Sequence, residues 1–293
     1  MNSGPMMKKS PVSGRFAALA SVLLFFTAPA LHAQGEAARL VFLNGKSVPL
    51  DKVSVEGGKF VFKEAMEGIP PNTSYPLAAA SHVSGEKPAA INKGIALILM
   101  EDYPEALKTL EPVLAAHKAT ASVPGNYWLP AARAMVLVYS LYNEPAKAEA
   151  LGKDIADATP ESGPDPITRL GQALALPLTV KFDERVAKLT EQISDTNPVE
   201  VSAYAAYFRG KLLRKIAEAK RQEEALTSFL TVGCLYPAGG LVVVSAAEMQ
   251  AADLIKTKPE RKEEALSLLE SAVRGGKGTA VGAAAIKARD SLK

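Results

Sequence analysis

Residues 222–226 read Gln-Glu-Glu-Ala-Leu, and residues 262–266 read Lys-Glu-Glu-Ala-Leu, 40 positions later. A related pentapeptide, Tyr-Pro-Glu-Ala-Leu, occupies residues 103–107. Similarity at a fixed spacing in helix-forming sequence is typical of stacked helical hairpins, because one hairpin cannot bury its apolar face alone. The sequence therefore predicts a mainly α-helical repeat protein.

A small or apolar residue marks the second helix of each predicted hairpin, at intervals of 42, 38, 39 and 40 residues. These five positions are Ala106, Ala148, Val186, Ala225 and Ala265. Seven residues after each of them comes another apolar residue: Val113, Ile155, Ile193, Val232 and Ala272. Two residues seven apart lie on one face of a helix, so both sets are predicted to face the core.

In three of the hairpins a proline follows twelve positions after the marker: Pro160 after Ala148, Pro198 after Val186 and Pro237 after Ala225. This pattern over residues 88–293 resembles the tetratricopeptide-repeat family, in a divergent form with longer repeats. The resemblance implies a right-handed, TPR-like α-solenoid of about five helix pairs. It also implies that the first helices line a concave groove for extended peptides. Gly94 and Gly210 are candidates for the small residue of a first helix. Asp102, Asn143 and Asn197, each shortly before a proline, are predicted to be N-caps. The last helical segment, residues 279–292, is expected to cap the stack.

Residues 34–63 differ from the rest of the chain. Short runs rich in β-branched and aromatic residues alternate there with the turn dipeptides Asn44-Gly45 and Gly57-Gly58. This pattern predicts a small β meander of three or four strands, a β leader that needs a packing partner to be stable. Residues 64–87 contain several prolines, which predicts a linker without regular structure.

Residues 1–33 have the pattern of a secretory signal peptide. Lys8, Lys9 and Arg15 precede an apolar run from residue 16 to residue 30, and Leu31-His32-Ala33 offers a cleavage site. The run is shorter than the roughly 20 residues that a membrane-spanning helix needs. We therefore expect an exported protein of the periplasm or the cell exterior, with no stable membrane span after cleavage. An uncleaved N-terminal anchor is the alternative.

The net charge and the few cysteine and histidine residues argue against nucleic-acid binding, metal binding and catalysis. Without the three basic residues of the signal, 31 basic and 31 acidic residues remain. A neutral protein lacks the electrostatic footprint of a nucleic-acid binder. The only cysteine, Cys234, is interpreted as a buried small residue, with intermolecular pairing as the alternative. His82 and His117 are isolated, so no metal site, cofactor or enzyme activity is expected.

A partner-binding surface is the remaining functional hypothesis. Aromatic and arginine side chains are common anchors of interfaces. A basic stripe of Lys211, Arg214, Lys215 and Arg221 follows the predicted first helix that contains Tyr204. We assign to the surface aromatic and arginine residues from the first helix of two different hairpins, together with two residues of the stripe: Tyr127, Trp128, Arg133, Tyr139, Tyr204, Tyr207, Lys211 and Arg214. The alternatives are that the rings pack as core between helices and that the basic stripe is a solvated face.

The sequence thus predicts a non-enzymatic protein–protein interaction scaffold of the cell envelope, with a protein partner on the concave face. One alternative is a structural subunit of an envelope assembly, held by strand addition to the β leader or by an uncleaved anchor. A second is a carbohydrate-processing or hydrolytic enzyme, which would need convergent carboxylates in a pocket. The identity of the partner is not encoded in any motif of the chain.

Overall fold

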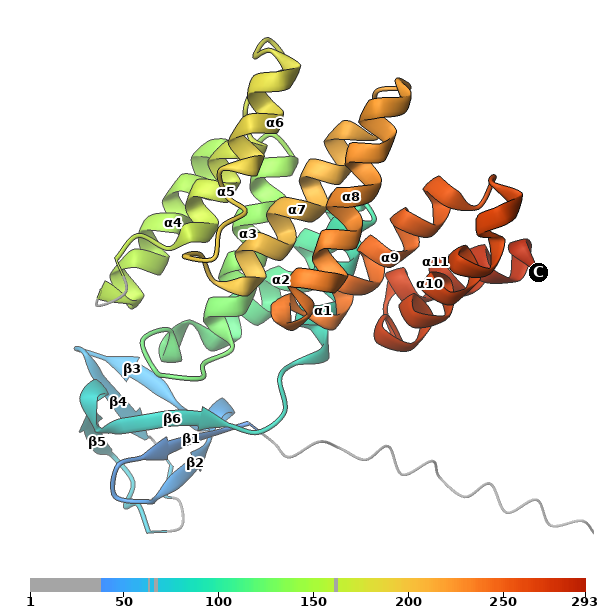
Figure 1. The fold of residues 1–293 in the computed structure, drawn as a ribbon. Coiled ribbons are helices and arrows are strands. Elements are labelled where there is room, and N and C mark those ends of the chain that lie inside the picture. The colour runs from blue at the N-terminus through green and yellow to red at the C-terminus, as the bar shows by residue number, and fades with distance from the viewer. Residues whose placement is uncertain (1–37, 63, 66–67, 161–162) are drawn as a thin grey trace, which may run out of the picture. The chain divides into compact units, whose positions relative to one another are not determined.

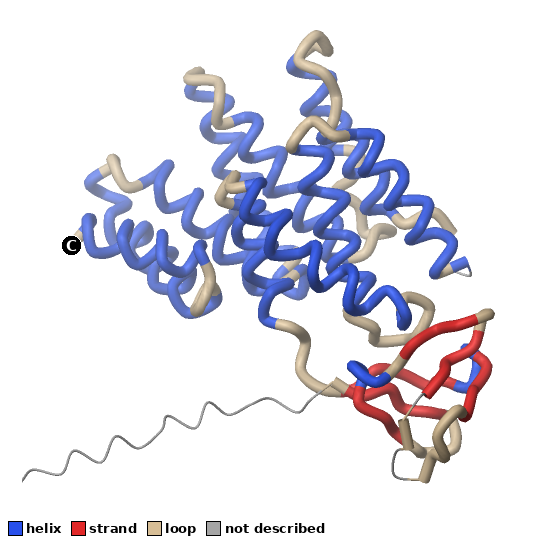
Figure 2. Tube along the Cα trace, turned by 180° about the vertical axis from the view of Figure 1, so that it is seen from behind, coloured by secondary structure: helices blue, strands red, loops and turns tan. Residues whose placement is uncertain are grey.

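The computed structural model describes residues 38–62, 64–65, 68–160 and 163–293 (Figures 1 and 2). The expected signal peptide, residues 1–33, lies outside the described residues. The segment Gly35–Lys293 forms one compact unit. Its described part is mainly helical, with a small antiparallel sheet region towards the N-terminus. No helix among the described residues has both the length and the apolar character needed to cross a bilayer.

The sheet region contains six short strands in the described residues, arranged in two three-stranded antiparallel sheets of order β2-β1-β6 and β3-β4-β5. Phe42 joins the two sheets, because its ring lies 6.2 Å from Phe60, 5.8 Å from Phe62 and 4.9 Å from Tyr75 between centroids. The strands are β1 Arg39–Phe42, β2 Ser47–Pro49, β3 Ser54–Glu56, β4 Lys59–Phe62, β5 Thr73–Pro76 and β6 Ala80–Ser84.

The expectation that residues 64–87 form a linker without regular structure is wrong, because β5 and β6 lie within this segment. The prolines are compatible with strands for a positional reason. Pro76 is the last residue of β5, which is an outer strand of its sheet, so its missing N–H breaks no continuous ladder. The β leader therefore extends to Ser84.

Eleven α-helices follow in the described residues. Each helix packs against the next one in the chain, and each odd-numbered helix also packs against the next odd-numbered helix. The helices are α1 Ala89–Leu99, α2 Tyr103–His117, α3 Trp128–Leu141, α4 Pro145–Ala158, α5 Pro166–Leu174, α6 Phe182–Thr190, α7 Val199–Leu213, α8 Ala219–Leu235, α9 Leu241–Ile255, α10 Lys262–Gly275 and α11 Ala280–Leu292.

The marker positions lie where the sequence predicts them, one on each even-numbered helix from α2 to α10. All five are buried, and so are four of the five residues seven positions later; Ile193 is partly buried just beyond α6. The predicted N-cap Asp102 accepts a hydrogen bond from the Glu105 backbone N–H at 3.4 Å.

Two other predicted N-caps are wrong. Helix α4 begins at Pro145, so Glu144 takes the cap position and Asn143 adopts a left-handed conformation with φ 62°. Helix α7 is capped by Pro198, and the Asn197 amide donates to the backbone carbonyl of Gln192 instead. In both cases the helix starts one residue later than the sequence pattern predicts.

The first helix, α1, also contacts the far end of the helical array. It packs against α3, α9 and α11 as well as α2. The Tyr207 hydroxyl on α7 donates a hydrogen bond of 2.8 Å to the backbone carbonyl of Leu99 at the end of α1. Four other odd-numbered helices, α3, α7, α9 and α11, therefore contact α1.

Close approach between helices explains one glycine of the predicted pattern. A Cβ atom placed on Gly94 of α1 would lie 2.4 Å from Leu110 Cγ on α2, and Leu110 is fully buried. By contrast, a Cβ on Gly233 of α8 would meet nothing nearer than 4.0 Å. The two glycines differ in packing while both lie in helices.

Gly94→Ala is therefore expected to lower the free energy of unfolding by about 1–3 kcal/mol through overpacking. Gly233→Ala, the matched control, should raise it by up to about 1 kcal/mol, because alanine favours helix. Urea denaturation of both variants measures this difference. Equal changes in the two variants would contradict the close α1–α2 contact.

Candidate partner-binding surface

The four aromatic residues Tyr127, Trp128, Tyr204 and Tyr207 of the predicted surface are buried, with exposed fractions of 6%, 0%, 3% and 0%. Lys118 Nζ lies 4.7 Å from the centroid of the Trp128 ring, and the Trp128 Nε1 atom is buried. These rings pack as core between helices, which is the alternative that the sequence leaves open. This placement corrects the expectation that they line an open groove.

Tyr127 and Tyr204 have polar surroundings that fit this role. The Tyr127 hydroxyl donates to the backbone carbonyl of Gly85 at 2.7 Å, which ties the end of the β leader to the start of α3. Burial, and to a smaller extent the nearby Glu200, raises the pKa of Tyr204 well above its usual value. Both groups therefore stabilise the fold in their neutral form.

Arg133 belongs to a cluster of charges that connects three odd-numbered helices. Its guanidinium donates two hydrogen bonds, of 2.7 and 2.9 Å, to Asp165 Oδ2, and Nη1 lies 3.7 Å from Glu200 Oε2. Asp165 also caps α5 by accepting from the Ile167 N–H at 3.0 Å. Burial raises the pKa of Glu200 and lowers that of Lys87. The cluster holds the starts of α5 and α7 against α3.

The remaining predicted residues, Tyr139, Lys211 and Arg214, are half-buried, and each contacts a different partner. Tyr139 lies under Lys147, whose Nζ is 5.5 Å from the ring centroid. Lys211 Nζ is 2.9 Å from Glu101 Oε1, whereas Arg214 forms an ion pair with Asp253. Of the eight predicted residues, Lys211 lines a surface pocket.

That pocket lies where α1, α3, α5 and α7 end, and we call it the end pocket. It has a volume of about 90 Å³. Its floor is apolar and its sides carry charges. The lining residues are Glu101, Tyr103, Leu141, Ala173, Leu174, Arg185, Leu189, Phe208, Lys211, Leu212 and Lys215.

The charges of the end pocket are unbalanced. Three cations, Arg185, Lys211 and Lys215, face one carboxylate, Glu101, which is paired with Lys211. Within the described part of the chain, the side chains of Arg185 and Lys215 form no ion pair or hydrogen bond. Two cationic groups are therefore available to a ligand.

Exposed apolar side chains lie next to the end pocket in the chain. Tyr142 follows the pocket residue Leu141, is 44% exposed and packs against the Tyr103 ring at 6.1 Å between centroids. Met100 precedes Glu101 and is 37% exposed. Burial and the nearby Glu101 raise the pKa of Tyr103 to about 12, so its hydroxyl is neutral at physiological pH. Tyrosine and methionine are enriched in protein interfaces.

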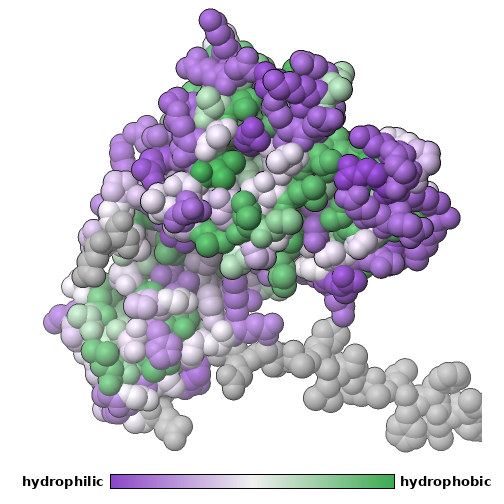
Figure 3. Space-filling view, in the orientation of Figure 1, coloured by the Kyte–Doolittle hydropathy of each residue, from purple (hydrophilic) through white to green (hydrophobic). Residues whose placement is uncertain are grey.

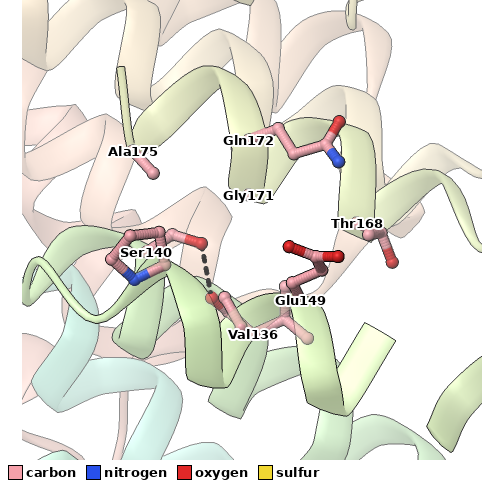
Figure 4. Close-up of a pocket in the computed structure, with 9 residues that line it drawn as sticks. Val136, Ser140, Glu149, Thr168, Gly171, Gln172 and Ala175 are labelled. Carbon is pink, nitrogen blue, oxygen red and sulfur yellow. Dashed lines mark hydrogen bonds between the residues drawn. The ribbon is translucent and has the colours of Figure 1, made fainter. Parts of the chain in front are cut away.

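A second hollow, of about 190 Å³, lies between α3, α4 and α5. Figure 4 shows the Glu149 side chain reaching from α4 towards Gly171 and Gln172 of α5. The Ser140 hydroxyl donates to the Val136 carbonyl at 2.8 Å, and Glu149 lies 3.1 Å from Lys153 Nζ. The hydroxyl and the carboxylate thus both have partners, and neither is placed as an activated nucleophile.

Other singled-out residues do not extend these surfaces. Cys234 is exposed, so its interpretation as a buried small residue is wrong. Among the described residues, no group of three or more His, Cys, Asp or Glu side chains could hold a metal ion. His117 packs edge-on against Tyr127 at 5.4 Å, and burial lowers its pKa.

Sequence reasoning missed Arg185, because it belongs to no repeat pattern and lies near Lys211 and Lys215 only in the folded chain. Lys215 belongs to the basic stripe that the sequence shows, but it was not among the residues assigned to the partner-binding surface. The signal available was indirect: Met100 and Tyr142 are large apolar residues at predicted helix ends. Comparisons with known proteins add no assignment, since no family model, curated protein or solved structure matches the chain.

Proposed function

We propose that this protein is an exported, non-enzymatic interaction scaffold, a TPR-like right-handed α-solenoid of five helix pairs closed by α11, that binds another protein reversibly. The order of helix contacts supports stacked helical hairpins, because each hairpin packs on the next and odd-numbered helices pack in sequence. The contacts of α1 with α9 and α11 are additional to those of an open solenoid, in which each repeat touches only its neighbours. Export rests on the pattern of residues 1–33.

The observation that carries the binding role is the surface around the end pocket. It combines an apolar floor, the exposed side chains of Tyr142 and Met100, and the cations Arg185 and Lys215, whose side chains have no partner among the described residues. Exposed apolar patches with aromatic and arginine side chains are typical of protein interfaces. The partner would thus dock where the odd-numbered helices end, while the buried rings Trp128 and Tyr207 hold those helices in place.

The test uses the tagged full-length chain to capture proteins from an envelope extract. Each captured protein is then purified and titrated into the chain by calorimetry. The proposal expects saturable binding with a fixed stoichiometry and no chemical change in the partner. If no captured protein binds saturably once purified, or if the partner is converted to a product, the scaffold proposal fails.

The alternative, an assembly subunit held by the β leader, makes a different prediction in the same titration. Val55 on the outer strand β3 is 36% exposed. Lysine on an outer strand opposes strand addition. Loss of binding in Val55→Lys, with binding retained in variants of the end pocket, would favour this alternative.

A further inference from the structure

We propose that the end pocket binds an acidic segment of a partner protein, taking one apolar side chain on its floor between carboxylates that pair with Arg185 and Lys215. This inference rests on the proposed scaffold function and specifies the chemistry of the partner. It follows from the size of the pocket, the position of its cations and the charge of the competing occupants.

The size of the pocket indicates a side chain as the occupant. Pockets for small molecules and cofactors usually enclose about 300–1,000 Å³. The end pocket encloses about 90 Å³, and the floor residues Leu189, Phe208 and Leu212 are at most 8% exposed. A leucine, phenylalanine or methionine side chain of a partner would cover this floor.

The position of Arg185 indicates that its charge is not explained by helix stability. Cations stabilise the C-terminal end of a helix, which accounts for Lys211 in the last turn of α7 and for Lys215 just beyond it. Arg185 is the fourth of the nine residues of α6 (Phe182–Thr190) and lies outside its last turn, so the helix dipole does not account for this cation. With no acidic partner among the described residues, Arg185 is free to bind a carboxylate from another chain.

Charge also selects the occupant. Residues 1–37 of the chain carry three basic residues and one acidic residue, so this segment does not complement the cations. A nucleic acid needs a larger basic footprint than two unpaired cations on a protein that is neutral without its signal. An acidic protein segment with apolar residues matches both the cations and the floor.

Apolar residues in the neighbouring turns support a protein as the partner. Leu178 follows α5 and is 87% exposed, and Ile216 follows Lys215 and is 37% exposed. Met100 and Tyr142 are the first residues after α1 and α3. Figure 3 shows apolar and hydrophilic residues side by side on the face of the helices turned to the viewer.

The experiment pans a phage-displayed library of random 12-residue peptides on the full-length chain. We expect enrichment of peptides with glutamate or aspartate on both sides of a leucine, phenylalanine or methionine. A synthetic peptide of the enriched sequence is then titrated by fluorescence anisotropy into three proteins: the unmodified chain, Arg185→Glu with Lys215→Glu, and a matched control, Lys277→Glu with Lys287→Glu. Both control lysines are exposed and unpaired among the described residues.

Reversal of the two pocket cations should weaken peptide binding at least tenfold, which corresponds to about 1.4 kcal/mol. The control changes the net charge by the same amount, but its two lysines do not line the end pocket, so it should bind within twofold of the unmodified chain. Higher salt should weaken binding to the unmodified chain, since exposed charge pairs are screened over about 10 Å at 0.1 M. Circular dichroism verifies that each variant is folded.

Several outcomes would overturn the inference. These are enrichment of neutral or basic peptides, equal weakening in both double variants, or binding of phosphatidylglycerol vesicles or a 20-nucleotide single strand that the pocket variant loses while no peptide binds. If a captured partner binds the pocket variant as tightly as the unmodified chain, this inference fails and the scaffold proposal stands. Failure of all partner binding defeats the scaffold proposal itself.

Discussion

Trp128→Ala should lower the free energy of unfolding by about 3–5 kcal/mol, the usual cost of removing a buried aromatic ring. The side chain is fully buried at the start of α3, under Lys118. Alanine there would lose the burial of the ring and leave a cavity between helices. Urea denaturation followed by circular dichroism measures the loss.

The same residue provides a spectroscopic check, because the chain has one tryptophan. Its emission in the folded protein should be blue-shifted and poorly quenched by acrylamide or iodide. Tyr142→Ala is the matched control, since that ring is 44% exposed and its removal should cost much less. Red-shifted, readily quenched emission together with a small loss in Trp128→Ala would restore the open groove that the sequence predicts.

Tyr207→Ala should also cost about 3–5 kcal/mol of unfolding free energy. The ring is fully buried, 5.8 Å from Phe229 between centroids, and its hydroxyl donates to the Leu99 carbonyl. That carbonyl lies at the end of α1, where no helical N–H is available to it. Tyr207 therefore connects α7 to α1 by both packing and a hydrogen bond.

A second substitution separates the two contributions. Tyr207→Phe keeps the ring and leaves the Leu99 carbonyl unpaired, so it should cost about 1–3 kcal/mol. Tyr142→Phe, which removes an exposed hydroxyl, should change stability by less than about 0.5 kcal/mol. If Tyr207→Phe and Tyr142→Phe were indistinguishable by urea denaturation, the bond between α7 and α1 would not contribute as described.

The helical part was predictable because its information is local and periodic. Markers such as Ala106 and Ala225, with apolar residues seven positions on, specify one buried face per helix. The same periodicity correctly predicts that Cys234 is exposed. It lies two residues after the buried Val232, which places it about 200° around the helix and in solvent.

Non-local contacts explain what the sequence did not predict. Strand β6 is formed by pairing with β1, about forty residues earlier, and local proline content suggested a linker instead. The availability of Arg185 and the engagement of Lys211 depend on whether a carboxylate from another helix is near, and Glu101 lies 110 positions from Lys211 in the chain. Aromatic residues such as Tyr204 are common in both cores and interfaces, so residue type alone cannot decide between them.

Hydrogen–deuterium exchange of the full-length chain, with and without its captured partner, tests the central claim most directly. Partner binding at the end pocket should protect amides in residues 99–103, 141–142, 174–189 and 208–216 and leave the strands of the β leader unchanged. Protection confined to residues 39–84, or spread along the odd-numbered helices away from their ends, would contradict binding at the end pocket.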